Sequence, residues 1–399
     1  MHISWNTFRR IIVNSAEYFQ QRLKVIFSVR WRRKRERTAL IDLDEINVPR
    51  RLNQICRLLR QAGYGLMVRV GWRDFIGFNR IGRESFRDPD TFLVPGKYPP
   101  ASLLVTDSDG PGCDAGRDIG PNESDNAGPA GSVVQGSGGD GWAEKMLRID
   151  YNFYPPDRAR FKENCYIPIM FHPALMTEEI YARAAELSRN SERRVGVMFA
   201  GSLMREQYNR DVIRDQYGLF TRNELIDAVE SWSELRERVY RPGSFEEFEE
   251  RKNRGELTDK IVIIDTRVCR IPQERWLEVL SEVAFFIAAP GISMPFCHNL
   301  PESMAVGAIP VIQFGDLLYP PLEDRKTCAA FGSLDELKGL ISKGIPYMSA
   351  GEIEKMRKRV VEYHRMHLSP ESFISKMREF EQDTRGELRL IMARRMYTE

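Results

Sequence analysis

The sequence predicts an α/β protein with two doubly wound domains that face a cleft. Short, continuous apolar runs alternate with amphipathic segments of helical period, the pattern of parallel strands covered by helices on both faces. The alternation occurs in two series, one ending near residue 172 and one beginning near residue 194. A chain of 399 residues also exceeds what one ordinary hydrophobic core accommodates.

The composition is that of a soluble globular protein, with 42% hydrophobic and 29% charged residues. A net charge of +2 gives no global indication of nucleic-acid binding. The six cysteines are scattered without metal-ligand spacing, which favours reduced thiols. No apolar run approaches the roughly 18 residues that span a bilayer, and the start lacks a signal-peptide core. We therefore expect a cytoplasmic protein.

Residues 1–37 form a segment of their own in this prediction. Large apolar residues recur at helical spacing: Phe8, Ile11, Ile12, Tyr18, Phe19 and Leu23. The stretch RWRRKRER follows, from Arg30 to Arg37. A basic stretch beside an amphipathic helix favours an anionic membrane surface, so peripheral attachment is one interpretation. A solvated, charged helix end is the other, and nucleic acid is not expected because no binding motif accompanies the charge.

Residues 38–172 are predicted to form the first domain. A strand at 38–43, a helix at 49–62 and a strand at 64–70 make a βαβ unit with short connections. Further strands are expected at 102–106 and from 146 to 154. Residues 107–141 are rich in Gly, Asp, Ser, Asn and Pro, so we expect a flexible surface insertion there.

Residues 173–365 are predicted to form the second domain, and 366–399 a charged helical segment after it. Strands are expected at 194–200, 261–265, 284–289 and 309–313. Helices are expected at 221–231, 272–282, 334–341 and 350–365. Thr221 and Glu224 have capping-box spacing at the start of one of these helices.

The stretch from Ala284 to Gly315 contains the most informative pattern. A buried strand, a loop rich in Pro and Gly, a short helix and a second strand follow one another. Asn299 is the expected N-cap, with Glu302 in the capping-box position, and the helix ends at Gly307. A ligand would then lie at the strand's C-terminal end, where unpaired N–H groups at the helix start favour a diphosphate. The alternative is an ordinary crossover in which Glu302 only caps.

A second phosphate-suited turn follows the strand at 194–200. Gly201 permits close backbone approach, Ser202 follows it, and Arg205 can make a charge-assisted contact. Arg205 is otherwise a surface arginine, and His298 an ordinary loop histidine.

The residues around these two turns resemble those of a known protein family. The segment resembles the C-terminal nucleotide-sugar-binding region of GT-B-fold glycosyltransferases, exostosin-like and lipopolysaccharide- or capsule-type enzymes among them, which have two Rossmann-like domains. The matching residues are Pro290-Gly291, then Glu302-Ser-Met-Ala-Val-Gly307-Ala-Ile-Pro310-Val311, with Phe199-Ala-Gly-Ser202 and Arg205 at the opening turn. Many retaining members carry a second glutamate where this chain has Met294, which leaves the stereochemical outcome open.

The resemblance implies roles for individual residues. It places Glu302 on the nucleotide ribose, and the helix start and Arg205 on the diphosphate. The implied donor site comprises Gly201, Ser202, Arg205, Gly291, His298, Asn299, Glu302 and Ser303.

The acceptor-activating base has three candidates, because no acceptor motif is recognisable in the first domain. Asp74 and Asp107 follow predicted strands, and His172 lies between the domains. Each could deprotonate an acceptor hydroxyl in an inverting enzyme, and each could instead be an ordinary loop residue.

No metal cofactor is predicted. Asp107 and Asp109 have Asp-x-Asp spacing but open the expected insertion. His364 and His367 lie three residues apart on a predicted helix, without a third ligand nearby, which favours a surface helix face.

The sequence thus predicts a metal-independent glycosyltransferase that uses a nucleotide-sugar donor and a glycan or glycolipid acceptor. Two alternatives remain: a nucleotide-sugar epimerase or hydrolase of the same fold, and a non-enzymatic membrane-surface binding protein.

Overall fold

The computed structural model contains two compact units, which we describe separately. Unit 1 comprises residues 1–150 and 373–390, and unit 2 comprises residues 151–372 and 391–399. The structure describes residues 5–27, 37–43, 49–78, 83, 85–86, 91–94, 101–107, 143, 145–151, 161–190, 192–208 and 211–393. Most of the stretch 30–37 and of the predicted insertion 107–141 lies outside these residues.

Unit 1 is built on a sheet with the order β3-β2-β1-β4-β5-β13-β6. The strands of this sheet in unit 1 are β1 (Thr38–Asp42), β2 (Gly65–Arg69), β3 (Thr91–Val94), β4 (Leu103–Thr106), β5 (Lys145–Asp150) and most of β13 (Glu387–Ile391), whereas the residues of β6 (Cys165–Tyr166) fall within unit 2. The five strands from β1 to β5 pair in parallel, and their order reverses between β1 and β4. This is the doubly wound arrangement predicted from the sequence.

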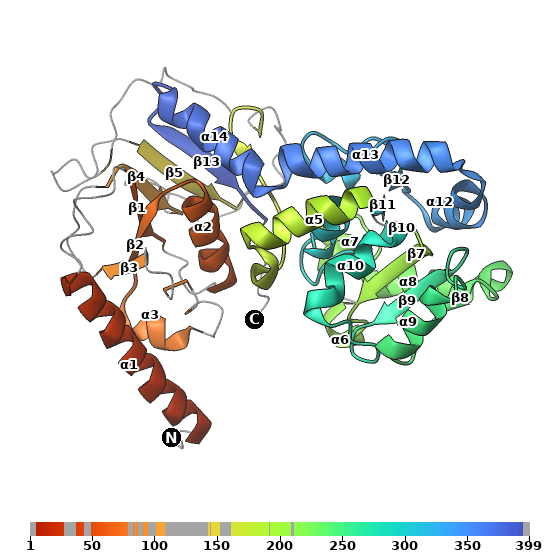
Figure 1. Cartoon of the computed structure of the whole chain (residues 1–399), viewed down its shortest axis with the longest axis horizontal. Coiled ribbons are helices and arrows are strands. Elements are labelled where there is room, and N and C mark those ends of the chain that lie inside the picture. The colour runs from red at the N-terminus through yellow and green to blue at the C-terminus, as the bar shows by residue number, and fades with distance from the viewer. Residues whose placement is uncertain are drawn as a thin grey trace. The chain divides into compact units, whose positions relative to one another are not determined.

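Helices flank this sheet (Figure 1). They are α1 (Trp5–Phe27), α2 (Pro49–Gln61), α3 (Trp72–Gly77) and α14 (Pro370–Gln382). Lys145 at the start of β5 holds α14 in place, because its ammonium donates to the backbone oxygens of Phe380 and Arg385 at 3.0 and 2.9 Å. A cation is favourable at a helix C-terminus, where carbonyl groups lack intrahelical partners.

The N-terminal helix belongs to unit 1, whereas the sequence suggested a separate segment. Asn14 is buried and donates to the Ile76 oxygen of α3 at 2.8 Å. Tyr18 is also buried and packs edge-on against Phe75 at 5.4 Å. Ile12 and Phe19 remain exposed on another side of the helix. The predicted single apolar face is therefore two faces, one packed and one open to solvent.

Unit 2 contains a six-stranded sheet with the order β12-β11-β10-β7-β9-β8. Its strands are β7 (Val195–Gly201), β8 (Val239–Tyr240), β9 (Ile261–Asp265), β10 (Val283–Ile287), β11 (Ile309–Ile312) and β12 (Ala329–Ala330). All neighbouring strands pair in parallel. The four longest strands are fully buried apart from Gly196 in β7, which explains their near-continuous apolar sequences.

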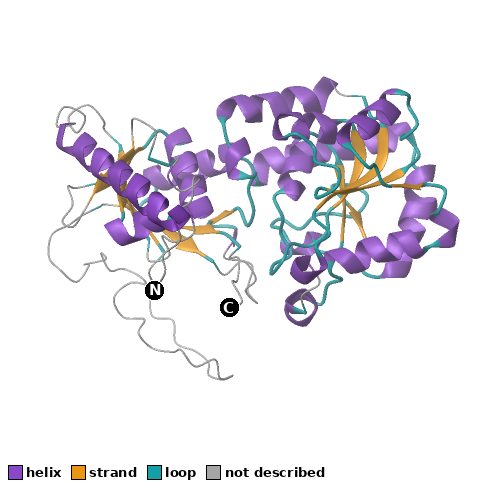
Figure 2. Cartoon of the chain, turned by 90° about the horizontal axis from the view of Figure 1, so that it is seen from below, coloured by secondary structure: helices purple, strands orange, loops and turns teal. Residues whose placement is uncertain are grey.

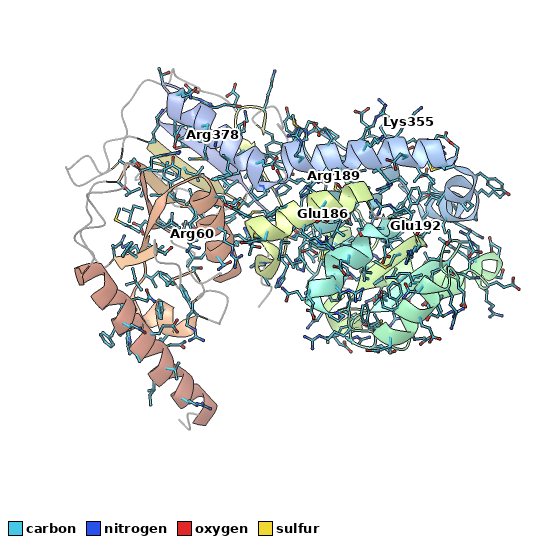
Figure 3. All side chains as sticks on the ribbon, viewed as in Figure 1. Arg60, Glu186, Arg189, Glu192, Lys355 and Arg378 are labelled. Carbon is cyan, nitrogen blue, oxygen red and sulfur yellow. The ribbon has the colours of Figure 1, made fainter. Side chains whose placement is uncertain are left out.

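Helices and short turns surround the sheet of unit 2 (Figure 2). The helices are α5 (Glu178–Asn190), α6 (Arg205–Tyr208), α7 (Val212–Tyr217), α8 (Arg222–Ser231), α9 (Phe245–Asn253), α10 (Trp276–Ser281), α11 (Asn299–Ala305), α12 (Leu334–Gly339) and α13 (Ala350–His367). Single turns are η2 (Pro173–Leu175), η3 (Ser233–Leu235), η4 (Gln273–Arg275), η5 (Gly315–Leu317), η6 (Leu340–Gly344) and η7 (Ile345–Tyr347). The solvent side of α13 carries charged residues such as Lys355 (Figure 3).

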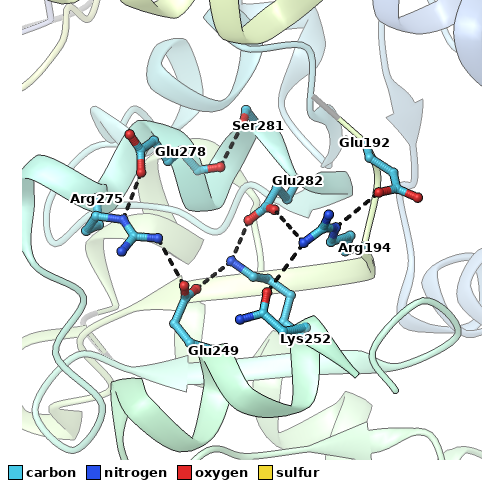
Figure 4. A network of polar contacts seen from close by, with 9 residues as sticks. Glu192, Arg194, Glu249, Lys252, Arg275, Glu278, Ser281 and Glu282 are labelled. Carbon is cyan, nitrogen blue, oxygen red and sulfur yellow. Dashed lines mark hydrogen bonds and ion pairs between the residues drawn. The ribbon is translucent and has the colours of Figure 1, made fainter. Parts of the chain in front are cut away.

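A charged network ties α9 to α10 and to the start of β7 (Figure 4). At its centre Lys252 is only 2% exposed, and its ammonium lies 2.5 Å from carboxylate oxygens of both Glu249 and Glu282. Glu282 in turn lies 3.7 Å from Arg194. A buried ammonium is tolerable only when it is paired in this way.

The unit boundaries differ from those predicted. Residues 151–172, expected to close the first domain, belong to unit 2, where Phe161 and Tyr166 join its core cluster. The final segment is not a purely helical appendage, because α14 and most of β13 belong to unit 1. Among the helices that the structure describes, none combines the length and hydropathy needed to cross a bilayer.

Candidate functional site

The strand order of unit 2 reverses between β7 and β10, and the candidate site lies where these two strands end. One series of strands continues from β7 through β9 to β8, and the other from β10 through β11 to β12. Because β7 and β10 are parallel neighbours, their carboxyl ends meet at the same edge of the sheet. Ligands of doubly wound sheets bind outside the strand ends at such a reversal.

Arg222 lies at this edge as the first residue of α8. The preceding Thr221 caps the helix in the predicted capping box with Glu224. The backbone of Phe220 makes two hydrogen bonds with the side chain of Gln313, at 2.9 and 2.8 Å. Since Gln313 directly follows β11, these bonds fix the start of α8 at the carboxyl edge of the sheet.

The guanidinium of Arg222 bridges the ends of the two central strands. Its Nη1 donates to the Ser202 oxygen after β7 at 3.1 Å, and its Nε to the Pro290 oxygen after β10 at 3.2 Å. The residue is 3% exposed, and its guanidinium carbon lies 3.8 Å from the ring centre of Tyr208. Within the part of the chain that the structure describes, no carboxylate pairs with it. A buried cation held by carbonyls, aromatic rings and a thiol sulfur, without a carboxylate, is expected to attract an anion.

Gly201 makes room for this guanidinium. A Cβ at residue 201 would lie 3.1 Å from Nη1 of Arg222 and 3.1 Å from the ring of Phe199. The close approach predicted at Gly201 is thus made by an arginine of the chain itself. Ser202 contributes its backbone oxygen to the same contact.

A small pocket opens beside Arg222. Its polar lining includes Arg222, Asn299 and Cys297, and its apolar lining includes Phe199 and Phe314. Asn299 donates from its side chain to the Ala200 oxygen of β7 at 2.8 Å, while the sulfur of Cys297 lies 3.7 Å from Nη2 of Arg222. Asn299, predicted for the donor site, therefore lies in this pocket together with Arg222.

Arg205, the predicted diphosphate contact, is on the surface. Its side chain is 65% exposed and makes a two-pronged pair with Asp227, with both N···O distances 2.9 Å. The arginine that lies at the ends of β7 and β10 is Arg222, which is absent from the predicted site. An arginine directly after the predicted cap Thr221 is the signal that could have identified it.

The start of α11 differs from the predicted anion site. His298 is the N-cap, and Asn299 is the first helical residue instead of the cap. Leu300 N–H already donates to the Cys297 oxygen at 3.0 Å, Glu302 N–H donates to the His298 oxygen at 3.2 Å, and Pro301 has no N–H. The helix start therefore offers few donors, and side chains must supply most of any anion binding.

Glu302 is buried, and both of its carboxylate oxygens already accept hydrogen bonds. Oε1 accepts from the backbone N–H of His172 at 2.7 Å, and Oε2 from the indole N–H of Trp276 at 2.6 Å. Burial raises the pKa of Glu302 to about 7, against the two donors, which lower it. The predicted capping role is wrong, since the carboxylate links α11 to α10 and to residue 172. A ribose hydroxyl would have to donate to a remaining lone pair on one of these buried oxygens.

Three other predicted residues lie around α11. The rings of His172 and His298 meet edge to face, with their centres 5.2 Å apart. Ser303 is fully buried and donates to the Leu300 oxygen of its own helix at 2.8 Å, so its hydroxyl faces no ligand.

Gly291 is required by the loop that follows β10. Its N–H donates to the Met294 oxygen at 3.0 Å, and a Cβ at residue 291 would lie 2.9 Å from that oxygen. The structure thus explains Gly291 by the shape of the loop, and its role in donor binding stays a prediction. Met294, where a second glutamate was considered, packs partly buried against the core.

The two aspartates predicted in the first domain have different settings. Asp107 directly follows β4, next to β1, at the strand reversal of unit 1. Asp74 lies within α3, not in a loop, and its side chain is outside the described residues.

His364 is buried in the core of unit 2, where the sequence suggested a surface helix face. Its ring lies 5.5 Å from that of Phe171, and its Nε2 has no hydrogen-bond partner among the described residues. Burial lowers the pKa of His364 to about 3. Within the described part of the chain, no three potential metal ligands cluster.

We predict that His364 makes unit 2 sensitive to acid. Its folded pKa lies below the unfolded value of 6.5, so the unfolded chain binds the extra proton between those values and stability falls as the pH drops through this window. At pH 5 the loss is about 2 kcal/mol. Urea unfolding at pH 7 and pH 5 should show that His364→Leu removes this part of the difference. An equal pH difference in the variant would contradict the prediction.

Among known proteins, the matches to this chain are solved structures of similar fold. No family model matches the chain, and no curated protein matches it. A glycosyltransferase from Rickettsia africae is similar in structure, with 11% identity and a TM-score of 0.44 over 87% of this chain and 99% of that one. HepE from Anabaena in complex with UDP has 9% identity and a TM-score of 0.41 over 87% and 99%. Sucrose-phosphate synthase from Thermosynechococcus elongatus has 12% identity and a TM-score of 0.41 over 87% and 98%.

Proposed function

We propose that the chain is a glycosyltransferase that moves a sugar from a nucleotide-sugar donor to a glycan or glycolipid acceptor in the cytoplasm. The observation that carries the proposal is Arg222, a buried guanidinium without a carboxylate partner in the described chain, at the strand reversal of a doubly wound sheet. A diphosphate supplies the negative charge that this position lacks. The strand–loop–helix pattern around Glu302 gives independent support from the sequence.

In this proposal the diphosphate is the leaving group. The acceptor hydroxyl oxygen forms a bond to the anomeric carbon, the bond from that carbon to the diphosphate oxygen breaks, and the nucleoside diphosphate leaves with the electron pair. Arg222 stabilises the charge that develops on the leaving oxygen, so no metal is needed for that role. Asn299, which lines the pocket beside Arg222, contributes to holding the donor.

The acceptor proton needs a base, and Asp107 is our first choice. It lies at the strand reversal of unit 1, where a doubly wound sheet presents its polar side chains. Asp74 on α3 and His172 beside His298 are the other two candidates. Asparagine replacement of the base should abolish turnover and leave donor binding intact.

The proposal is tested by thermal unfolding with UDP, GDP, ADP or CMP at millimolar concentration. A nucleotide present at 100 times its Kd stabilises the folded state by about 2.7 kcal/mol, which raises the Tm by several degrees. Incubating the donor without acceptor then separates two activities: a transferase gives at most slow hydrolysis, and an epimerase returns an isomeric sugar nucleotide. The absence of a shift with all four nucleotides would refute the proposal.

A further inference from the structure

One side of α1 exposes a continuous apolar stripe. Ile12 is 53% exposed, Val13 49% and Phe19 60%, and Ala16 between them is also exposed. Positions 12, 16 and 19 follow one another on the same side of a helix, because residues three and four apart are neighbours there. We call Ile12, Val13, Ala16 and Phe19, together with Trp72, the α1 apolar face.

This face is not the one that attaches α1 to unit 1. Asn14 and Tyr18, on the other side of the helix, are 1% and 5% exposed and hold α1 against α3. The helix is therefore anchored through one side, while the apolar face stays open to solvent. Exposed apolar side chains scattered singly need no explanation, but a stripe along a fixed helix indicates a binding surface.

Trp72 extends the face from α3. It is 42% exposed, and its indole N–H donates to the hydroxyl of Ser15 on α1 at 3.3 Å. Exposed arginines lie next to the stripe in sequence at Arg9 and next to Trp72 at Arg73. An indole and arginines beside aliphatic side chains are the combination found where proteins meet lipid headgroups.

The charge of residues 1–37 indicates which kind of partner the α1 apolar face binds. Residues 1–37 contain ten Lys and Arg against two Glu, whereas the whole chain has a net charge of only +2. Such a segment is attracted to an anionic surface. It also disfavours pairing of this face with a second copy of the chain, since two strongly basic segments would then repel each other.

We propose that the α1 apolar face docks on a bilayer that contains anionic lipids. Ile12, Val13 and Phe19 enter the boundary between headgroups and acyl chains, Trp72 lies at headgroup depth, and Arg9 and Arg73 contact lipid phosphates. The chain is then held on the surface without crossing it. This inference does not depend on the proposed sugar transfer, because it rests on residues of unit 1 alone.

The test is flotation of the whole chain with vesicles, in the absence of any nucleotide. We expect binding to vesicles of phosphatidylcholine with 30% phosphatidylglycerol, and little binding to phosphatidylcholine alone. The variant Ile12→Ser with Phe19→Ser should bind about tenfold or more weakly, because two apolar side chains no longer enter the bilayer. Its Tm should match that of the parent, since both positions are exposed.

The matched control is Val268→Ser with Tyr347→Ser, at exposed apolar positions of unit 2 that are 64% and 84% accessible. This variant should bind vesicles as the parent does. Equal binding by the α1 variant would overturn the proposal, because charge alone would then explain attachment. A dimer in solution that dissociates in the α1 variant would overturn it in favour of a second copy.

Discussion

Replacing Arg222 with Gln should weaken nucleotide binding strongly while leaving the fold intact. The guanidinium is the charged group at the ends of β7 and β10, and hydrogen bonds to charged groups contribute about 1.5–3 kcal/mol each. We therefore expect the Kd for the stabilising nucleotide to rise about 100-fold by calorimetry. Because the folded chain no longer buries an unpaired cation, the Tm without nucleotide should change little.

Arg205→Gln is the matched control for this experiment. It removes the same chemical group from the same unit, but from an exposed position where the guanidinium pairs with Asp227. Exposed pairs contribute about 0–1 kcal/mol, so both Kd and Tm should remain close to those of the parent. If Arg205→Gln weakened binding and Arg222→Gln did not, the diphosphate would belong at the turn predicted from the sequence.

Replacing Glu302 with Ala should destabilise unit 2 by about 3 kcal/mol or more. The change leaves two buried donors, the His172 N–H and the Trp276 indole, without acceptors, and it also opens a cavity. Urea unfolding measures the loss. Glu336→Ala on α12 is the control, because that carboxylate is exposed and accepts only a local bond from Gly332.

Glu302→Gln separates a structural role from the predicted ribose contact. The amide retains the volume of the side chain, so the variant should fold. If Glu302 only links α11 to its neighbours, the Kd for nucleotide stays near the parent value. If Glu302 also binds the ribose, the Kd for nucleotide of the Glu302→Gln variant rises above the parent value.

The pH dependence of stability gives a further readout for Glu302. Its pKa is raised from 4.5 to about 7 by burial, so the unfolded chain releases a proton that the folded chain keeps. The stability that this group contributes is fully present below pH 4.5 and is lost as the pH rises to 7, by about 3 kcal/mol. His364 acts in the opposite direction, so each effect is read as the difference between one variant and the parent. A Glu302→Gln curve parallel to that of the parent would contradict this prediction.

The sequence predicted most of the strands because each of them is a short, local run of apolar residues. A parallel strand covered on both faces must be apolar throughout, so β1, β2, β9 and β11 are visible as short apolar runs. The capping box at α8 is equally local, since Thr221 and Glu224 bond to each other's backbone. Nothing local indicates that β13, after α14, returns to the first sheet.

The site was predicted less well, because residues of the same type in the same region of the sequence turned out to have different surroundings. Arg205 and Arg222 are both arginines near the end of β7, yet one is exposed and the other buried. Glu302 has the spacing of a helix cap, but α11 begins one residue earlier than the cap requires, and the carboxylate turns to Trp276. Such outcomes depend on which elements pack against a side chain.

By itself, the sequence determined two doubly wound series of strands and helices, and it predicted a region of unit 2 where an anion should bind. These features follow from the spacing of apolar residues and from helix-capping residues, and both signals come from positions close together in the sequence. Only the tertiary structure decided that Arg222 occupies that region, that Glu302 is buried between α10 and residue 172, and that one face of α1 is open. The physical reason is that burial, and with it the strength of a charge, is set by contacts between residues far apart in the chain.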